Sequence, residues 1–410
     1  MHTADLGPGP VVEPDGPAAP SLILLAFASS LSPFGMSVIF PVLPEIAASF
    51  NVSTADAQFL IAVYLFGLAV GQPVAGIAAD RFGRRVVMLS GFVLFTLSSV
   101  ACRFMPDFAM LVALRFVQAL GVSVGTIVSR AVISDSFDAL AAARALSWIG
   151  AAMGVAPMLG PVIGGGLAAW ADPLAVFAVS AGLGFGLTGA LFIWLREPNR
   201  AAPITGDQPG LWPGVLLQLV RSPAFMGHTL LFAFTQGSFF AFLAVGAAVF
   251  DQHLQIGPQT FGVIWGGMSM IYVVGAIISA RLARRAGTDG ALRTSTRLSA
   301  AAGGLLLLAT VFTGVTLPGL LLPIAILMIA AGIQTPLSMA GVLNSTPALS
   351  GTAAGLSSSM ALGLGGAFSI VSGQLYAGSF IPVAMLMASA ATMTLLAHRI
   401  AQQPARLPLR

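Results

Sequence analysis

The stretch Gly76-Ile-Ala-Ala-Asp80-Arg81-Phe-Gly83-Arg84-Arg85 lies where one apolar run, 57–79, gives way to the next, 86–105. Each run is close to the roughly 20 residues that an α-helix needs to cross the hydrocarbon core of a bilayer. Glycine allows a tight turn between two such helices, because it adopts backbone conformations that other residues avoid. The stretch therefore predicts a short basic loop between two membrane-spanning helices.

The rest of the chain follows the same pattern. Of its 410 residues, 57% are apolar and 8% are charged, whereas a soluble globular protein carries about 25% charged residues. This composition excludes a soluble enzyme, a disordered chain, a disulfide-rich scaffold and a nucleic-acid-binding domain. We predict an all-α polytopic membrane protein with twelve transmembrane helices, near residues 21–44, 57–79, 86–105, 108–133, 145–169, 174–195, 224–250, 260–283, 294–314, 318–341, 352–375 and 380–398.

The spans fall into two groups of six, which predicts two six-helix bundles joined by a cytoplasmic linker. Two similar halves with a substrate site between them at mid-membrane are typical of secondary transporters. The predicted parts are a disordered cytoplasmic tail at 1–20, an N-terminal bundle at 21–195, a linker at 196–222, a C-terminal bundle at 223–399 and a cytoplasmic tail at 400–410.

The arginines orient the chain, because cytoplasmic loops carry an excess of basic residues. With both termini in the cytoplasm, 16 of the 18 arginines fall in cytoplasmic loops or tails. The arginine triplet of the quoted stretch recurs 200 residues later, at Arg281, Arg284 and Arg285. We therefore predict a multi-pass protein with two related halves and cytoplasmic termini.

The orientation of the chain in the membrane explains the arginines of the first loop but not Asp80. An acid here can pair with the neighbouring arginines or with a helix N-terminus that faces it. The quoted stretch resembles the G-x-x-x-D-R-x-G-R-R signature of the major facilitator superfamily. The resemblance implies a conformational latch made of Gly76, Asp80, Arg81, Gly83, Arg84 and Arg85. It also implies that Asp80 faces the start of span eleven near Gly351 and Thr352, and that Arg84 or Arg85 pairs with Asp135.

A second motif places an arginine inside a span, in the segment Leu111-Val-Ala-Leu-Arg115-Phe-Val-Gln118-Ala-Leu-Gly121. Such an arginine is costly unless it faces a partner or water. One interpretation is that Arg115 snorkels to the outer surface. The other follows from the resemblance, since the family carries an arginine in span four, followed by glutamine and glycine, that is associated with proton transfer.

A third motif fills span five with small residues and two prolines. Small residues let helices approach closely, and each proline removes a helix hydrogen bond and favours a kink. Close packing alone could explain the pattern, but it also resembles the G-P-x-x-G-G motif of exporters in the family. The residues are Gly150, Gly154, Pro157, Gly160, Pro161, Gly164 and Gly165.

The chain is most similar to the bacterial twelve-span drug:proton antiporters, near the bicyclomycin and chloramphenicol exporters. The segments 41–44 (Pro-Val-Leu-Pro) and 351–355 (Gly-Thr-Ala-Ala-Gly) support this subgroup. One departure is important: the subgroup commonly has an aspartate in span one where this chain has Ser37. Glu45 and Asp56, near the outer ends of their spans, are then the possible proton sites, although solvent exposure is the simpler interpretation of both.

The fold implies a central cavity lined mainly by spans one, four, seven and ten. Aromatic, methionine and amide side chains with few charges suit amphiphilic organic molecules, although each could equally serve packing or contact lipid. The candidate cavity residues are Ser29, Phe34, Ser37, Tyr64, Met153, Gln236, Phe239, Phe240, Trp265 and Gln334.

Three functions stay open at this point. The first is export of drug-like or amphiphilic small molecules by alternating access with proton antiport. The second is a proton-independent facilitator, or a sugar or metabolite exporter, and the third is a non-transporting membrane sensor. The sequence contains no motif for a cofactor, a metal ion or ATP, and its single Cys102 cannot form an internal disulfide. We expect no enzyme activity and a monomer in the bacterial inner membrane whose partners are a small-molecule substrate, protons and the lipid bilayer, with no nucleic acid.

Overall fold

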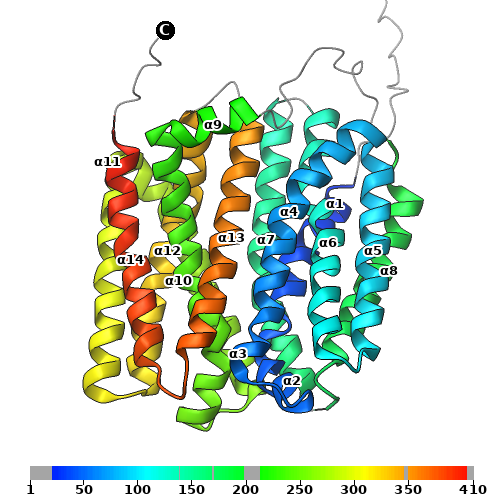
Figure 1. The fold of residues 1–410 in the computed structure, drawn as a ribbon. Helices are drawn as coiled ribbons and strands as arrows, with labels where there is room; N and C mark the ends of the chain where they lie inside the picture. The colour runs from blue at the N-terminus through cyan, green and yellow to red at the C-terminus, as the bar shows by residue number, and fades with distance from the viewer. Residues whose placement is uncertain (1–20, 138, 169, 198–212, 346–349, 404–410) are drawn as a thin grey trace, which may run out of the picture.

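The computed structural model describes residues 21–137, 139–168, 170–197, 213–345 and 350–403, and these are almost entirely helical with no strand (Figure 1). The predicted tails, 1–20 and most of 400–410, lie outside the described residues. Eleven helices of the described chain are long and apolar enough to cross a membrane. The prediction of an all-α polytopic protein is confirmed.

The N-terminal bundle contains the first six predicted spans. Span one is not one straight helix, because it breaks after Ser37 into a short 3-10 turn and a second short helix. The elements are α1 (Leu22–Ser37), η1 (Phe40–Val42), α2 (Leu43–Ser49), α3 (Thr54–Ala57), α4 (Phe59–Phe82), α5 (Arg84–Phe104), α6 (Phe108–Ser136), α7 (Ala139–Ala168) and α8 (Ala175–Trp194).

The C-terminal bundle contains the other six. Its elements are α10 (Pro223–Leu254), α11 (Pro258–Thr313), α12 (Leu317–Ser345), α13 (Ser350–Leu375) and α14 (Ile381–Ala401). Spans eight and nine, predicted as separate helices, are both contained in α11, which is interrupted at Gly287 with φ 72° and ψ 166°. Glycine adopts this positive φ without the strain that other residues would suffer, so the chain reverses there and two spans result.

A further helix, α9 (Pro213–Arg221), occupies the end of the predicted linker. The sequence predicts only a polar connection here, so this helix was not expected. Leu219 on α9 is buried against Phe225 and Val342 of the C-terminal bundle. The last part of the linker is therefore attached to the bundle that follows it.

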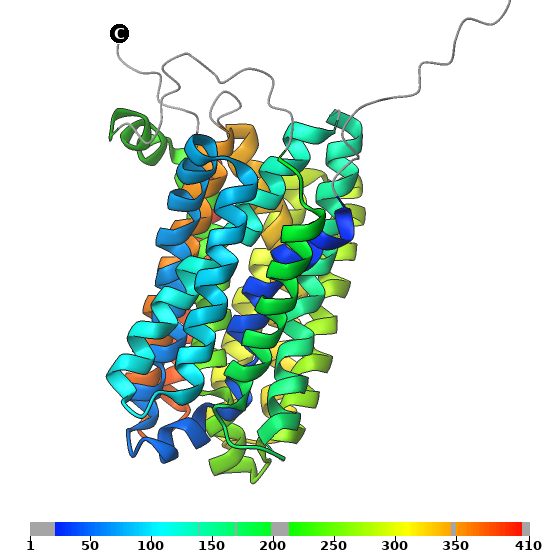
Figure 2. The same cartoon turned by 90° about the vertical axis from the view of Figure 1, so that its right-hand side faces the viewer.

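The helix axes run roughly parallel, and the turn between α4 and α5 lies at the same end as the last turn of α14 (Figures 1 and 2). We call this the inner end, because it carries the arginine loops, and the opposite end with α2 and α3 the outer end. Close approach within the N-terminal bundle depends on small residues: Gly67 packs on Ala119, and Gly125 packs on the backbone of Ala28. Between the bundles, α4 packs on α13 and α7 packs on α11.

Candidate functional site

Arg84 lies at the centre of the inner-end loop. Its Nη1 atom lies 2.6 Å from Oδ1 of Asp80, and its Nε atom lies 3.0 Å from Oδ2 of Asp135. The pairing expected of Arg84 or Arg85 with Asp135 is present with Arg84. The arginine side chain is 13% exposed, whereas that of Asp80 is 70% exposed. The ion pairs tie α4, α5 and α6 together at the inner end.

Glu197, which follows α8, is a part of this loop that the sequence analysis missed. Its carboxylate accepts hydrogen bonds from the backbone N–H groups of Arg84, at 2.6 Å, and Arg85, at 2.8 Å. Gly83, with φ 102°, ends α4 and presents the first turn of α5 to this acid. An acid at a helix N-terminus satisfies free N–H groups and favours the helix dipole. The only sequence signal was a lone acid directly after span six.

Arg85 completes the contact between the loop and α8. Its Nη2 atom donates to the carbonyl oxygen of Phe192 at 2.7 Å, and its guanidinium lies 5.5 Å from the centre of the Phe192 ring. The expected contact of Asp80 with the start of span eleven, near Gly351 and Thr352, stays a prediction, because the ion-pair partner of Asp80 in this structure is Arg84. The latch residues that the structure brings together all belong to the N-terminal bundle.

Arg115 is buried in the interior of the N-terminal bundle, with 1% of its surface exposed. It does not snorkel. Its guanidinium lies 4.1 Å from the centre of the Tyr64 ring, and it donates to the carbonyl oxygens of Gly35 and Leu60, each at 3.3 Å. These contacts join α1, α4 and α6. A buried arginine is tolerated when carbonyl oxygens and an aromatic face replace water around it.

Gln118 extends this buried network toward α5. Its Oε1 atom accepts from Nη1 of Arg115 at 2.5 Å, and its Nε2 atom donates to Oγ of Ser99 at 2.6 Å. Nη2 of Arg115 is buried with no hydrogen-bond partner among the described residues. Gly121 packs against the backbone of α5 at Gly91 and Phe95. The span-four motif therefore surrounds a polar centre inside one bundle.

The span-five motif divides into two parts. In the outer part, a side chain at Gly160 would collide with Ser37, and one at Gly164 would collide with the carbonyl of Val38. In the inner part, the positions that a side chain would occupy at Gly150 and Gly154 have no neighbouring atom within 4 Å. The tightly packed glycines of the motif thus lie in the outer half of α7, where it meets α1 and α11.

The two bundles meet along glycine contacts at the outer half of the molecule, and we call this region the outer seam. Bulk added at any of these glycines would strike the opposite bundle. The contacts include Gly165 with Pro258, Gly262 with Pro161, Gly266 with Val162, Gly366 with Ala62, and Gly373 with Gln58. At the inner half, Gly355 of α13 has open space around it. The glycine contacts between the bundles therefore lie at the outer half of the described structure.

Gln58 occupies an unusual place in the outer seam. It is fully buried, and neither its Oε1 nor its Nε2 atom has a hydrogen-bond partner among the described residues. Burying an amide without a partner is unfavourable. The closed seam therefore carries a polar group that would gain hydrogen bonds from water if the seam opened.

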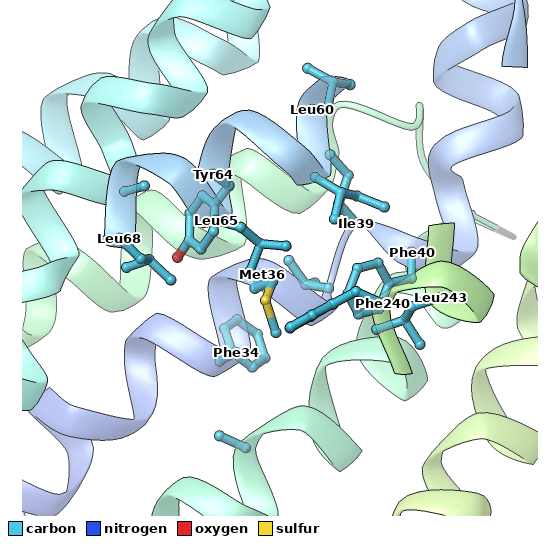
Figure 3. Close-up of a cluster of buried hydrophobic side chains, with 14 of the residues drawn as sticks. Phe34, Met36, Ile39, Phe40, Leu60, Tyr64, Leu65, Leu68, Phe240 and Leu243 are labelled. Carbon is cyan, nitrogen blue, oxygen red and sulfur yellow. The ribbon is translucent and has the colours of Figure 1, made fainter. Parts of the chain in front are cut away.

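Aromatic side chains reinforce the seam on the inside. Phe40 of η1, in the N-terminal bundle, lies beside Phe240 and Leu243 of α10, in the C-terminal bundle (Figure 3). All three are at most 1% exposed. Phe240 also packs on Gly365 of α13.

Most of the predicted cavity residues are buried in this structure. The exceptions, Met153, Gln236 and Phe239, are partly exposed. Ser29 donates to the carbonyl of Gly125 at 3.2 Å, and the hydroxyl of Tyr64 donates to the carbonyl of Ser32 at 3.0 Å. The other buried members are Phe34, Ser37, Phe240, Trp265 and Gln334.

The two possible proton sites differ in their surroundings. Asp56 forms a capping box with Ser53: its Oδ2 atom accepts from the Ser53 hydroxyl at 2.7 Å, and its N–H donates to that hydroxyl at 3.0 Å. The cap accounts for this carboxylate without a proton-carrying role. Glu45 is half-buried, and its Oε2 atom is buried with no partner among the described residues.

No group of three or more potential metal ligands occurs in the part of the chain that the structure describes. The structure thus has two helical bundles that contact along the outer seam. A polar centre lies inside the N-terminal bundle, and a charged loop lies at the inner end. This arrangement is that of a polytopic membrane transporter.

Comparison with known proteins places the chain in a family. The model of the Major Facilitator Superfamily matches residues 25–370, and the chain belongs to this family. It is therefore a membrane transporter and not an enzyme, and it is a multi-pass protein of the bacterial inner membrane.

Its relatives include proteins named for drug resistance. An uncharacterized MFS-type transporter of Bacillus subtilis, YdgK, is 29% identical over 75% of this chain and 77% of its own length. A bicyclomycin resistance protein homolog of Haemophilus influenzae is 22% identical over 92% of this chain and 94% of its own. The multidrug resistance protein MdtL of Escherichia coli is 34% identical over 44% of this chain and 46% of its own.

Solved structures agree on the fold. A D-xylose–proton symporter superposes with a TM-score of 0.74 at 16% identity, covering 92% of this chain and 96% of that one. A bacterial homologue of the lysosomal transporter Spinster, in an inward-facing conformation, superposes with a TM-score of 0.68 at 17% identity, covering 93% and 92% of the two chains.

Proposed function

We propose that this transporter exports drug-like or amphiphilic small molecules by alternating access, driven by proton antiport. The observation that carries the proposal is the outer seam, where glycines of each bundle pack against the other bundle, while the added side chain at Gly150, Gly154 or Gly355, in the inner halves of α7 and α13, would meet no atom within 4 Å. A carrier that alternates access must close one end while the other is open. The relatives named for multidrug and bicyclomycin resistance support the substrate class and the outward direction.

The loop contacts give the moving parts of this cycle. Arg84, Asp135 and Glu197 bind α4, α5, α6 and the end of α8 to one another, so the N-terminal bundle moves as one body. Asp80 keeps an exposed carboxylate at the inner end of α4. When the inner end closes, Asp80 meets the N-terminus of α13, where a negative charge is favourable. The latch then holds the outward-facing state.

Proton coupling is assigned to the outer end. Glu45 is half-buried, and its Oε2 atom is buried with no partner among the described residues. A buried carboxylate oxygen without a partner favours binding of a proton. The termini lie in the cytoplasm. The transporter acts as a monomer, because the two bundles that enclose the transport path belong to the same chain.

An efflux-deficient bacterial strain expressing the chain tests the proposal. We expect reduced accumulation of several amphiphilic antibiotics and dyes, and loss of this effect when an uncoupler collapses the proton gradient. A matched pair of variants sharpens the experiment: Gly262→Leu should block efflux by disrupting the seam, whereas Gly267→Leu, at a position with open space, should not. Equal accumulation with and without the protein would contradict export.

A facilitator without proton coupling is the second candidate, and Ser37 favours it. Its hydroxyl donates to the carbonyl of Phe34 at 3.2 Å, and it is 1% exposed. The position at which related antiporters carry an acid is thus closed and neutral here. Efflux that persists unchanged after the uncoupler is added would support this candidate over antiport.

A further inference from the structure

The C-terminal bundle contains a cavity within itself, separate from the space between the bundles. It encloses about 30 Å³, which exceeds the roughly 10–15 Å³ that a single water requires. Helices α10, α11, α12 and α14 all contribute to its wall. The corresponding centre of the N-terminal bundle is filled by Arg115 and Tyr64.

The wall of this cavity is apolar and aromatic. Phe242 stacks on Trp265 with ring centres 5.1 Å apart, and Phe239 lies 6.0 Å from the same indole. Three hydroxyls line it. Thr235 donates to Oε1 of Gln334 at 2.6 Å and Ser238 to the carbonyl of Met387 at 3.5 Å, whereas Ser299 forms no hydrogen bond among the described residues. The cavity therefore suits a small uncharged group that is mainly apolar, with the Ser299 hydroxyl as its one free polar contact.

Phe239 separates this cavity from the space between the bundles. It lines the cavity, and it is only partly buried. It precedes Leu243 by one helical turn, so both lie on the same face of α10. Because Leu243 lies beside Phe40 of the other bundle (Figure 3), this face of α10 points toward the N-terminal bundle. Gln236, partly exposed and seven residues before Leu243, lies on that face as well.

We propose that the cavity behind Phe239 is a substrate subsite that receives a small apolar substituent, such as a methyl, chloro or ethyl group, of the exported compound. Rotation of the Phe239 side chain admits the substituent, while Gln236 binds a polar group of the same molecule at the mouth. The proposal rests on the proposed function for the identity of the ligand. The cavity itself can be tested without transport.

Xenon is the probe, because apolar cavities bind it without needing polar contacts. The purified protein carries 5-fluorotryptophan at Trp265 alone, with the other tryptophans replaced by phenylalanine, and its fluorine resonance is followed as xenon pressure rises. We expect a saturable shift. Ala331→Leu, which fills the wall, should weaken xenon binding at least tenfold, and Ala301→Leu, at an exposed alanine of α11, should leave it unchanged.

Met328→Ala enlarges the cavity and should strengthen xenon binding, which keeps the test valid if Ala331→Leu does not fold. A shift that does not saturate, or that is the same in all variants, would overturn the proposal. The second arm compares efflux of two compounds that differ by one chloro substituent. Ala331→Leu should lower efflux of the chlorinated compound several-fold relative to the other, and an unchanged ratio would overturn the subsite. Absence of efflux for every compound would instead refute the proposed function, while the xenon result would still decide the cavity.

Discussion

Replacing Gln58 by leucine should shift the transporter toward the state with a closed outer end. The side chain keeps nearly the same volume, so its packing on Gly373 is retained, and two buried polar atoms without partners are removed. Each such atom costs about 1–3 kcal/mol when buried. Removing one such penalty from the closed state alone changes the balance between the two states by about 5- to 150-fold.

The shift can be measured as a distance between spin labels on the outer ends of the two bundles. Ala48 in α2 and Ala377 after α13 are both exposed and take the labels as cysteines, while Cys102 is buried and does not react. In Gln58→Leu we expect the short-distance population to grow and the rate of efflux to fall. Gln72→Leu, on the partly exposed face of α4, is the matched control. Equal distance distributions in Gln58→Leu and the parent would refute the argument that the buried amide opposes closure.

Three further predictions concern the motifs. Glu197→Gln should weaken the cap of α5 by about 0.5–2 kcal/mol, seen as faster hydrogen exchange at Arg84 and Arg85, and unchanged exchange would contradict the cap. Gly160→Leu should abolish efflux because its side chain would displace Ser37, whereas an active Gly160→Leu protein with normal membrane insertion would show that this contact is dispensable. Arg115→Ala should destabilise the purified protein by about 2–5 kcal/mol, as a buried large-to-small change does, and lower its transport; an unchanged thermal midpoint would mean that the carbonyl and Tyr64 contacts add nothing.

The sequence predicted the fold well because membrane-spanning helices are set by local composition. Apolar length fixed the spans, and arginine spacing indicated the two halves. The exact position of the break at Gly287 could not be predicted, because a glycine ends a helix only where its backbone adopts a non-helical conformation. The second part of span one, from η1 to α2, was missed because its residues are as apolar as a continuous helix.

The site was predictable where a motif names both partners and less so where packing decides. Arg84 and Asp135 could be paired from the resemblance. Glu197 could not, because its role depends on where α8 ends in space. The resemblance associates Arg115 with proton transfer, yet the groups around it are backbone carbonyls, the Gln118 amide and aromatic rings. Gln58 drew no attention, because a single glutamine at a helix start is ordinary until the opposite bundle buries it.

The central claim is that the outer seam must open in each transport cycle, and a reversible cross-link tests it most directly. The Cβ position at Gly373 lies 3.0 Å from Cβ of Gln58, close to the roughly 3.5–4.5 Å that a disulfide spans. We predict that the Gln58→Cys, Gly373→Cys double variant loses efflux on oxidation and regains it on reduction, while each single variant is insensitive to both. Full efflux by the oxidised, cross-linked protein would contradict alternating access through this seam.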